Sequence, residues 1–260
     1  MSTDSSYKSD TVTLPNSPVV LLHGWGMNKN IWRPFIERLP LDIQSRIVTL
    51  DLPGFGDNDW IPAQYDLPSL TSWLDKQISE PCILLGWSLG GLVAQHYAIN
   101  HPDKVARLGL IASSPKFMAE GDWHGIKPET LTMFSEQLML NHEQTIERFL
   151  AIQAMGAKSA RQDIKNIRDL VLQAPVPNLI ALEQGLQLLQ LVDLRTQFQY
   201  LSVPVVGLFG RLDALVPVGA VEAMQQLNPN AGLTVLNKAS HAPFISHVDE
   251  FLTWFNKTVN

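Results

Sequence analysis

Five short, uniformly apolar runs recur along the chain, and they limit the possible folds more than any other feature. The runs cover residues 18–23 (PVVLLH), 46–51 (RIVTLD), 82–87 (CILLGW), 105–111 (VARLGLI) and 203–209 (VPVVGLF). They lack the alternation of half-exposed strands, which indicates strands covered on both faces, as in a parallel sheet. Helical patterns over 31–39, 69–79 and 89–100 separate the first four runs, and Ser69 is the expected N-cap of the second. This β-α-β alternation predicts an α/β fold with a doubly wound, mostly parallel sheet.

A second kind of pattern fills the middle of the chain, where strand-like runs disappear between about residues 116 and 190. Helical patterns follow one another over 129–140, 144–155, 159–173 and 178–190. The strand pattern resumes at 203, so the segment interrupts one domain rather than dividing two. We therefore expect a core of residues 1–115 and 191–260 with a helical lid insertion at 116–190, over the sheet edge, where a lid of this kind can enclose a ligand.

Composition limits the classes of function. The chain has 45% hydrophobic residues and a mean hydropathy of +0.02, which is typical of a packed core. A net charge of -6 disfavours nonspecific binding to nucleic acid or anionic membranes, and there is no apolar run of about 18 residues that could span a bilayer. The single cysteine, Cys82, lies in an apolar run, which favours a buried thiol and a reducing compartment. We expect a cytoplasmic monomer without nucleic-acid or membrane partners.

The run at 82–87 leads into the motif that carries the chemistry. Residues 86–90 read Gly-Trp-Ser-Leu-Gly, the pattern G-x-S-x-G, at a predicted strand-turn-helix junction. A nucleophile in such a turn holds a strained backbone conformation, and the two glycines let strand and helix pack closely. The motif predicts that Ser88 is a nucleophile at the sheet edge. An inert serine in a glycine-rich turn is the alternative.

A serine hydroxyl needs a base to take its proton, and the base needs an acid to orient it. Around such a turn, the acid follows a late strand and the histidine comes last. Asp213 follows the run at 203–209, and His241 follows the run LTVL at 233–236, so we expect a triad of Ser88, Asp213 and His241. Asp193, ahead of the late run, is the alternative acid. The other histidines occupy none of the required places: His23, His96, His101, His124, His142 and His247.

Two backbone N–H groups are needed to stabilise the oxyanion of the tetrahedral intermediate. The residue after the nucleophile, Leu89, is one expected donor. Trp25, in the sequence His-Gly-Trp-Gly after the first run, is the other, because the glycines allow a backbone amide to turn inward. The indoles of Trp25 and Trp87 would line the acyl pocket; burial in the core is the alternative for both.

These motifs, with DLPGFG (51–56), FGRLDALVP (209–217) and SHAPFISH (240–247), resemble the α/β-hydrolase superfamily. A narrower resemblance, over roughly residues 18–255, is to the pimeloyl-[acyl-carrier protein] methyl ester carboxylesterases of biotin synthesis. It rests on LLHGWGMN, GWSLGGLVA, WHGIKPETL, ERFLAIQAMG and HAPFISHVDEF. This resemblance implies an α/β-hydrolase fold and hydrolysis of pimeloyl-[acyl-carrier protein] methyl ester to pimeloyl-[acyl-carrier protein] and methanol. It implies no metal and no organic cofactor.

Matching positions carry the family's site onto this chain. The resemblance implies the triad and the oxyanion residues already named, and Trp25, Ser88, Leu89 and His241 would contact substrate. Further substrate contacts would come from the motif F-L-A-x-Q: Phe149, Leu150, Ala151, Ile152 and Gln153. Contacts to the acyl-carrier protein would come from Arg148, Arg161 and Lys165. Gln144 stands where another arginine would be expected, which would weaken carrier binding.

The carrier contact has some support from spacing alone. Lys158, Arg161, Lys165 and Arg168 are 3, 4 and 3 residues apart, which aligns four cations along one helix face. Such a stripe could meet an acidic helix or a phosphate, and a solvated helix face is the alternative.

Two other functions stay open for the whole chain. One is a general short-chain carboxylesterase or C–C bond hydrolase acting on a free small molecule, because that enzyme would use the same triad. The other is a noncatalytic ligand-binding protein on the same fold. The complete set of triad and oxyanion residues speaks against this second alternative.

Overall fold

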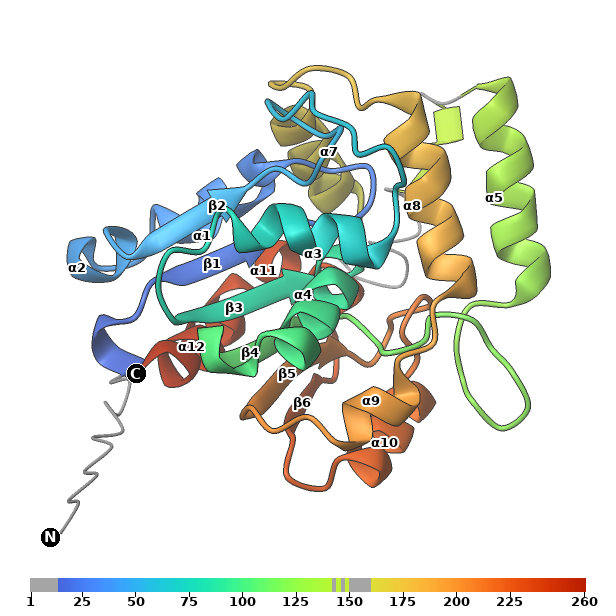
Figure 1. Ribbon diagram of the computed structural model, residues 1–260. Helices are drawn as coiled ribbons and strands as arrows, with labels where there is room; N and C mark the ends of the chain where they lie inside the picture. The colour runs from blue at the N-terminus through green and yellow to red at the C-terminus, as the bar shows by residue number, and fades with distance from the viewer. Residues whose placement is uncertain (1–13, 142–143, 146–147, 150–159) are drawn as a thin grey trace, which may run out of the picture.

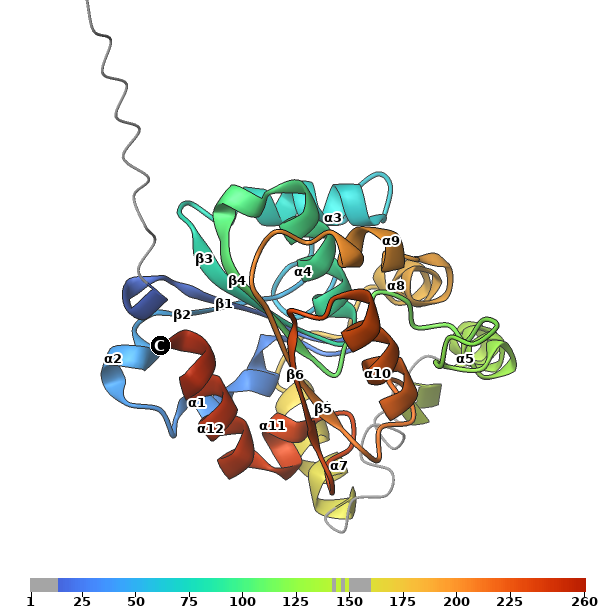
Figure 2. The ribbon, with the colours of Figure 1, turned by 90° about the horizontal axis from the view of Figure 1, so that it is seen from below.

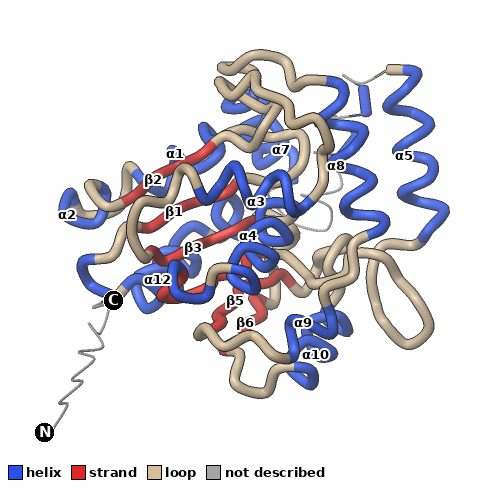
Figure 3. The backbone as a smooth tube through the Cα atoms, in the orientation of Figure 1, coloured by secondary structure: helices blue, strands red, loops and turns tan. Residues whose placement is uncertain are grey.

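The computed structural model describes residues 14–141, 144–145, 148–149 and 160–260, and a six-stranded sheet lies at its centre (Figures 1 and 3). The strand order is β2-β1-β3-β4-β5-β6, and each neighbouring pair is parallel. The strands are β1 (Val19–Leu22), β2 (Ile47–Leu50), β3 (Cys82–Trp87), β4 (Val105–Ile111), β5 (Val205–Gly210) and β6 (Gly232–Leu236). All six lie within the predicted runs or within one residue of them, which confirms the parallel sheet.

Helices cover both faces of this sheet (Figure 2). One face carries α3 (Leu67–Asp75), α4 (Leu89–Asn100), α9 (Arg195–Gln199) and α10 (Val218–Leu227). The other face carries α1 (Arg33–Ile36), α11 (Pro243–Ser246) and α12 (Val248–Val259), and α2 (Leu41–Gln44) precedes the edge strand β2.

Two apolar cores result, one on each side of the sheet. Along β1, Val20 and Leu22 belong to the core beneath α3 and α4, whereas Val19 and Leu21 belong to the core beneath α1 and α12. Successive strand side chains point to opposite faces, so a strand buried on both faces needs an apolar residue at every position. This explains why the runs lack alternation. Cys82 is fully buried in the first core, as expected, and burial raises the pKa of its thiol to about 12.

The starts of two helices differ from the sequence patterns. Ser69 is not the N-cap of α3; Asp66 is, because its Oδ1 accepts the Ser69 backbone N–H at 2.9 Å. The proline at 68 fits the first turn, where a helix needs no N–H donor. The pattern at 31–39 folds as a 3₁₀ turn over Lys29–Trp32 followed by the short α1.

The segment between β4 and β5 contains α5 (Pro128–Leu140), α7 (Ala160–Val171) and α8 (Leu179–Leu191), in agreement with the helical patterns at 129–140, 159–173 and 178–190. The pattern at 144–155 lies largely outside the described residues. Helices α5 and α8 pack side by side, and α8 also contacts α4 (Figure 1). Helix α7 lies on the other face of the sheet, where it contacts α11 (Figure 2). Within the described ranges, no helix is long and apolar enough to cross a membrane.

The two ends of this segment lie next to each other. The Leu194 N–H donates to the Pro115 carbonyl at 2.8 Å. Beside this bond, Lys116 Nζ lies 3.1 Å from Asp193 Oδ2, and Arg195 Nη2 lies 2.6 Å from the same oxygen. We call this group of five residues the insertion clasp. It holds the start of the helical segment against its end.

Candidate active site

The predicted triad and oxyanion residues all follow strands of the sheet. From β1 the chain runs out to the edge strand β2 and then returns to β3 on the other side of β1, so the strand order reverses between β1 and β3. Ligands of open α/β sheets bind outside the carboxyl ends of the strands at such a switch point. Trp25 follows β1 and Ser88 follows β3, while Asp213 and His241 come after β5 and β6.

Ser88 occupies the sharp turn between β3 and α4. Its φ of 54° and ψ of -120° lie in a region that residues other than glycine rarely adopt, and its N–H donates to the Ile111 carbonyl at 3.0 Å. A Cβ at Gly86 would collide with the backbone of Gly90, and one at Gly90 would collide with the Leu22 carbonyl. The strained turn and the need for both glycines are therefore confirmed.

Asp213 and His241 form a buried pair. His241 Nδ1 lies 2.8 Å from Asp213 Oδ2, while Asp213 Oδ1 accepts the backbone N–H groups of Leu215 at 2.8 Å and Val216 at 3.0 Å. The indole of Trp87 donates to the His241 carbonyl at 2.8 Å. Because the carboxylate can only accept, His241 carries its proton on Nδ1, and the lone pair of Nε2 is left available.

Two polar atoms of this site are buried without a hydrogen bond. In the part of the chain that the structure describes, Ser88 Oγ and His241 Nε2 have no hydrogen-bond partner, and both side chains are almost completely buried. A buried polar atom without a partner destabilises a fold, so such atoms require an explanation. A hydroxyl and an unprotonated imidazole nitrogen are the pair needed to activate a serine.

Asp193, the alternative acid, is engaged in the insertion clasp. Arg195 donates to both of its oxygens, and Lys116 donates to one of them. Burial alone raises the pKa of Asp193, but these hydrogen bonds lower it to about 2. Asp213, and not Asp193, contacts His241.

His23 has a function that sequence reasoning did not assign. The Leu52 N–H donates to His23 Nε2 at 3.0 Å, so the ring proton is on Nδ1, which donates to the Gly24 carbonyl at 2.8 Å. Burial lowers the pKa of His23, against the attraction of Asp51, and keeps the ring neutral. His23 thus joins the loop that contains Trp25 to the loop DLPGFG. The sequence signal that could have indicated this role is the position of His23 at the end of a fully apolar run, directly before Gly24.

The two expected oxyanion residues lie beneath the helical segment. Leu89 begins α4, so its N–H has no acceptor within the helix and lies at the positive end of the helix dipole. Trp25 is fully buried: its indole donates to the Leu182 carbonyl of α8 at 2.8 Å, and its ring centre lies 4.8 Å from that of Phe149. The ring of Trp87 instead packs against Phe244 at 4.9 Å, which favours the core alternative for Trp87.

The expected lid residues are described in part. Phe149 is brought against Trp25, whereas Leu150, Ala151, Ile152, Gln153 and Lys158 lie outside the described residues. The expected carrier contacts Arg148, Arg161 and Lys165 are all exposed, as is Gln144. Arg168 is exposed too, and it interacts with another group of the protein.

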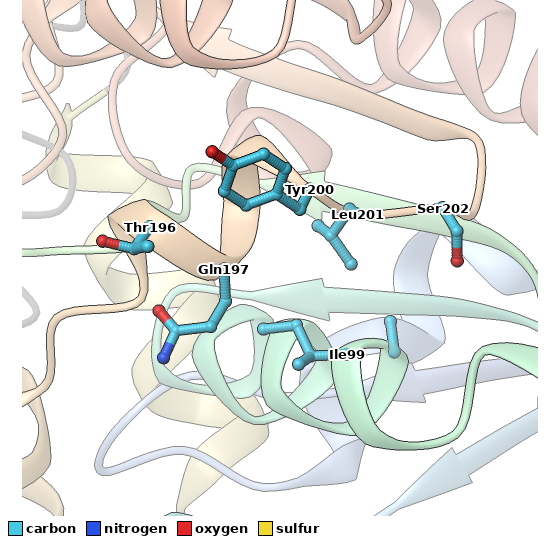
Figure 4. Close-up of a pocket in the computed structure, with 7 residues that line it drawn as sticks. Ile99, Thr196, Gln197, Tyr200, Leu201 and Ser202 are labelled. Carbon is cyan, nitrogen blue, oxygen red and sulfur yellow. The ribbon is translucent and has the colours of Figure 1, made fainter.

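The surface also has a separate groove of about 230 Å³, whose lining residues are shown in Figure 4. Its lining residues are Ala98, Ile99, Thr196, Gln197, Tyr200, Leu201 and Ser202. Ile99 is near the carboxyl end of α4, whereas Ser88 caps its amino end, about 16 Å away along the helix axis. The groove therefore does not belong to the triad. Among the described residues, no three His, Cys, Asp or Glu side chains are arranged to hold a metal ion.

Comparison with known families gives an independent view of this site. A family described as the alpha/beta hydrolase fold matches residues 17–248, which include every triad residue. The chain belongs to the α/β-hydrolase family.

Two relatives in this family carry the same descriptive name. The protein from Pseudoalteromonas atlantica is 47% identical, over 93% of this chain and 94% of its own length, and is named pimeloyl-[acyl-carrier protein] methyl ester esterase. The protein of the same name from Aeromonas hydrophila subsp. hydrophila is 46% identical, over 90% of this chain and 92% of its own length.

Solved structures support the hydrolase fold. An esterase from Exiguobacterium antarcticum superimposes with a TM-score of 0.82 at 23% identity, covering 94% of this chain and 91% of its own. A bromoperoxidase from Bacillus anthracis gives a TM-score of 0.79 at 19% identity, with the same coverage. At such low identities the likeness concerns the α/β-hydrolase fold alone.

Proposed function

We propose that this α/β-hydrolase is a serine carboxylesterase that hydrolyses the methyl ester of pimeloyl-[acyl-carrier protein] methyl ester. The buried Asp213–His241 pair, in which His241 Nδ1 lies 2.8 Å from Asp213 Oδ2 and Nε2 has no hydrogen-bond partner among the described residues, is the observation that carries the chemistry. The substrate is inferred from relatives of that name, such as the two that are 47% and 46% identical over 93% and 90% of the chain. The sequence resemblance adds a place for the reaction in biotin synthesis.

The reaction begins with attack of Ser88 Oγ on the ester carbonyl carbon, while His241 Nε2 takes the hydroxyl proton. Asp213 stabilises the imidazolium, and the backbone N–H groups of Leu89 and Trp25 donate to the oxyanion. Collapse of the tetrahedral intermediate breaks the bond to the methoxy oxygen, and His241 protonates it to release methanol. Water then attacks the acyl-enzyme with His241 again as base, giving the free carboxylate and restoring Ser88.

The helical segment at 116–190 favours a substrate that is bound to a carrier protein. We propose that residues 116–190 are a lid on a core of 1–115 and 191–260, with Phe149 and Trp25 as part of the acyl-binding wall and Leu150 to Gln153 contributing further contacts. Exposed Arg148, Arg161 and Lys165 supply positive charge on this lid, which suits an acidic acyl-carrier protein. The buried, unpaired Cys82 supports a cytoplasmic location, and we propose a monomer without nucleic-acid or membrane partners, and no cofactor.

Comparing two esters tests the substrate. At equal concentrations, kcat/KM for pimeloyl-[acyl-carrier protein] methyl ester should exceed that for dimethyl pimelate by at least about a hundredfold, because the free ester lacks the carrier contacts. Equal turnover of both would favour the general carboxylesterase alternative. A complementation experiment tests the reaction in the cell. If this gene restores growth without biotin to a strain that lacks this esterase, the reaction takes place in biotin synthesis.

Substitution of the nucleophile tests the chemistry. Ser88→Ala should lower turnover of both esters roughly 10⁴-fold or more and abolish covalent labelling by a fluorophosphonate. The matched control is Ser79→Ala, which removes an exposed hydroxyl after α3 and should leave both readouts unchanged. Labelling that survives in Ser88→Ala would identify another nucleophile, and an unlabelled wild-type protein would favour the noncatalytic alternative.

A further inference from the structure

A second buried serine contacts the nucleophile's backbone. The hydroxyl of Ser113 donates to the Ser88 carbonyl oxygen at 2.8 Å, and Ser113 is fully buried. Ser113 comes two residues after the end of β4, the neighbour of β3. The contact therefore joins the turn that carries the nucleophile to a separate strand.

The residue before Ser113 has an unusual conformation. Ala112 has a φ of 44°, in the left-handed region, and its N–H donates to the Leu208 carbonyl of β5 at 2.9 Å. Ser88 and Ala112 are the two residues other than glycine with positive φ in the described part of the chain. Strained residues of this kind persist where their surroundings hold them, and they gather at functional sites. Two adjacent strands thus end in strained residues, and the Ser113 hydroxyl connects them.

The other bonds to the Ser88 carbonyl differ in kind. This oxygen also accepts the N–H groups of Gly91 at 2.9 Å and Leu92 at 3.2 Å, which are the ordinary bonds of the first turn of α4. They fix Ser88 relative to its own helix. A Cβ added at Gly91 would collide with the Ser113 side chain, so the two segments are in close contact. Among these donors only Ser113 lies outside α4, and its bond adds to the one from the Ser88 N–H to the Ile111 carbonyl of β4.

We propose that Ser113 is a positioning residue for Ser88: its hydrogen bond holds the strained turn at the angle that directs the Ser88 hydroxyl toward His241. The inference rests on the proposed function of Ser88 as nucleophile. Loss of the bond should leave the substrate-binding surface unchanged and should let the turn rotate, so that fewer molecules present Oγ to the base at any time.

Kinetics of Ser113→Ala test this proposal. The kcat should fall about three- to tenfold, the range that corresponds to loss of one hydrogen bond, with KM unchanged. The rate of fluorophosphonate inactivation should fall by the same factor, because that reaction also requires attack by Ser88. The midpoint of the acid limb of the pH–rate profile should not move, because the His241–Asp213 pair is intact. Ser113→Cys, whose thiol is a weak donor of similar size, should lie between Ser113→Ala and wild type.

A matched control separates positioning from general stability. Thr258→Val removes another buried hydroxyl that donates to a backbone carbonyl, that of Trp254 in α12, and should lower the melting temperature without changing kcat or the inactivation rate. Wild-type kcat and inactivation rates in both Ser113 variants would overturn the proposal, even if their melting temperatures fell. If Ser88→Ala retained esterase activity, the proposed nucleophile itself would be wrong, which is a separate outcome.

Discussion

At the scale of single residues, His23 joins the loop that contains Trp25, an expected oxyanion residue, to the loop that begins at Asp51. It accepts the Leu52 N–H and donates to the Gly24 carbonyl, and both bonds require the neutral ring with its proton on Nδ1. Protonation of Nε2 would remove the acceptor and place a charge in a fully buried position. The loop that contains Trp25 is therefore coupled to the protonation of His23.

This coupling predicts a pH dependence of stability. Burial lowers the pKa of His23 in the folded protein, so the unfolded state binds more protons once the pH falls below the unfolded pKa of about 6.5. The free energy of unfolding should therefore decrease between pH 7.5 and 5.5, by up to about 1.4 kcal/mol per pH unit from this group. Urea unfolding of wild type and His23→Gln measures the effect. Equal pH slopes in the two proteins would contradict it.

The proposed triad could be assigned from the sequence because its three positions are tied to strand ends and to a fixed chain order. Ser88 has a five-residue pattern around it, and Asp213 and His241 follow two late strands. Ser113 and His23 also follow strands, but no catalytic motif surrounds them, and their partners are backbone atoms brought near by the fold. Their function depends on hydrogen bonds between loops, which residue spacing does not encode.

At the scale of elements, α8 contacts both expected oxyanion residues directly. Its Leu182 carbonyl accepts the Trp25 indole, and a Cβ at Gly185 would lie 2.8 Å from Trp25 Cδ1 and 3.4 Å from a methyl carbon of Leu89. Glycine at 185 thus lets α8 approach both expected oxyanion residues. The helical pattern at 178–190 predicted this helix, but it could not predict which loop the helix would cover.

Gly185→Ala should therefore destabilise the protein, although alanine has a higher helix propensity than glycine. In an exposed helix the change stabilises by about 1 kcal/mol, but here the added methyl must displace α8 or the indole, which costs about 1–3 kcal/mol. We expect a lower melting temperature and a kcat reduced several-fold. The control is Gly232→Ala, where the new methyl would lie 3.6 Å from Val206 and has room. Higher stability with unchanged kcat in Gly185→Ala would show that α8 does not fix Trp25.

At the scale of the whole molecule, the charges are unevenly distributed. The chain has a net charge of -6, yet Arg148, Arg161 and Lys165 are exposed on the proposed lid. An acidic carrier would be repelled by the molecule as a whole and attracted by this surface, and both effects weaken over a screening length of about 10 Å at 0.1 M salt. Orientation of the carrier would thus depend on a few side chains.

Charge reversal tests this orientation. Arg161→Glu should raise KM for the carrier-linked ester about tenfold at low salt, with a smaller effect at 0.5 M salt and none on dimethyl pimelate. Lys76→Glu makes the same change in net charge at an exposed position after α3 and should have little effect. A loss of activity toward both esters would indicate damage to the fold instead.

The insertion clasp has a consequence for assembly of the sheet. Strands β4 and β5 are neighbours although about a hundred residues of chain separate their paired positions. Closing so long a loop is entropically unfavourable, and the cost grows with the logarithm of its length. Once Pro115 and Leu194 are in contact, only short segments at either end remain to be closed, which reduces this entropic cost by roughly 1.5 kcal/mol. Because the cost grows only with the logarithm of loop length, a change in the length of a segment whose ends meet in this way would have a small effect on the pairing of β4 with β5.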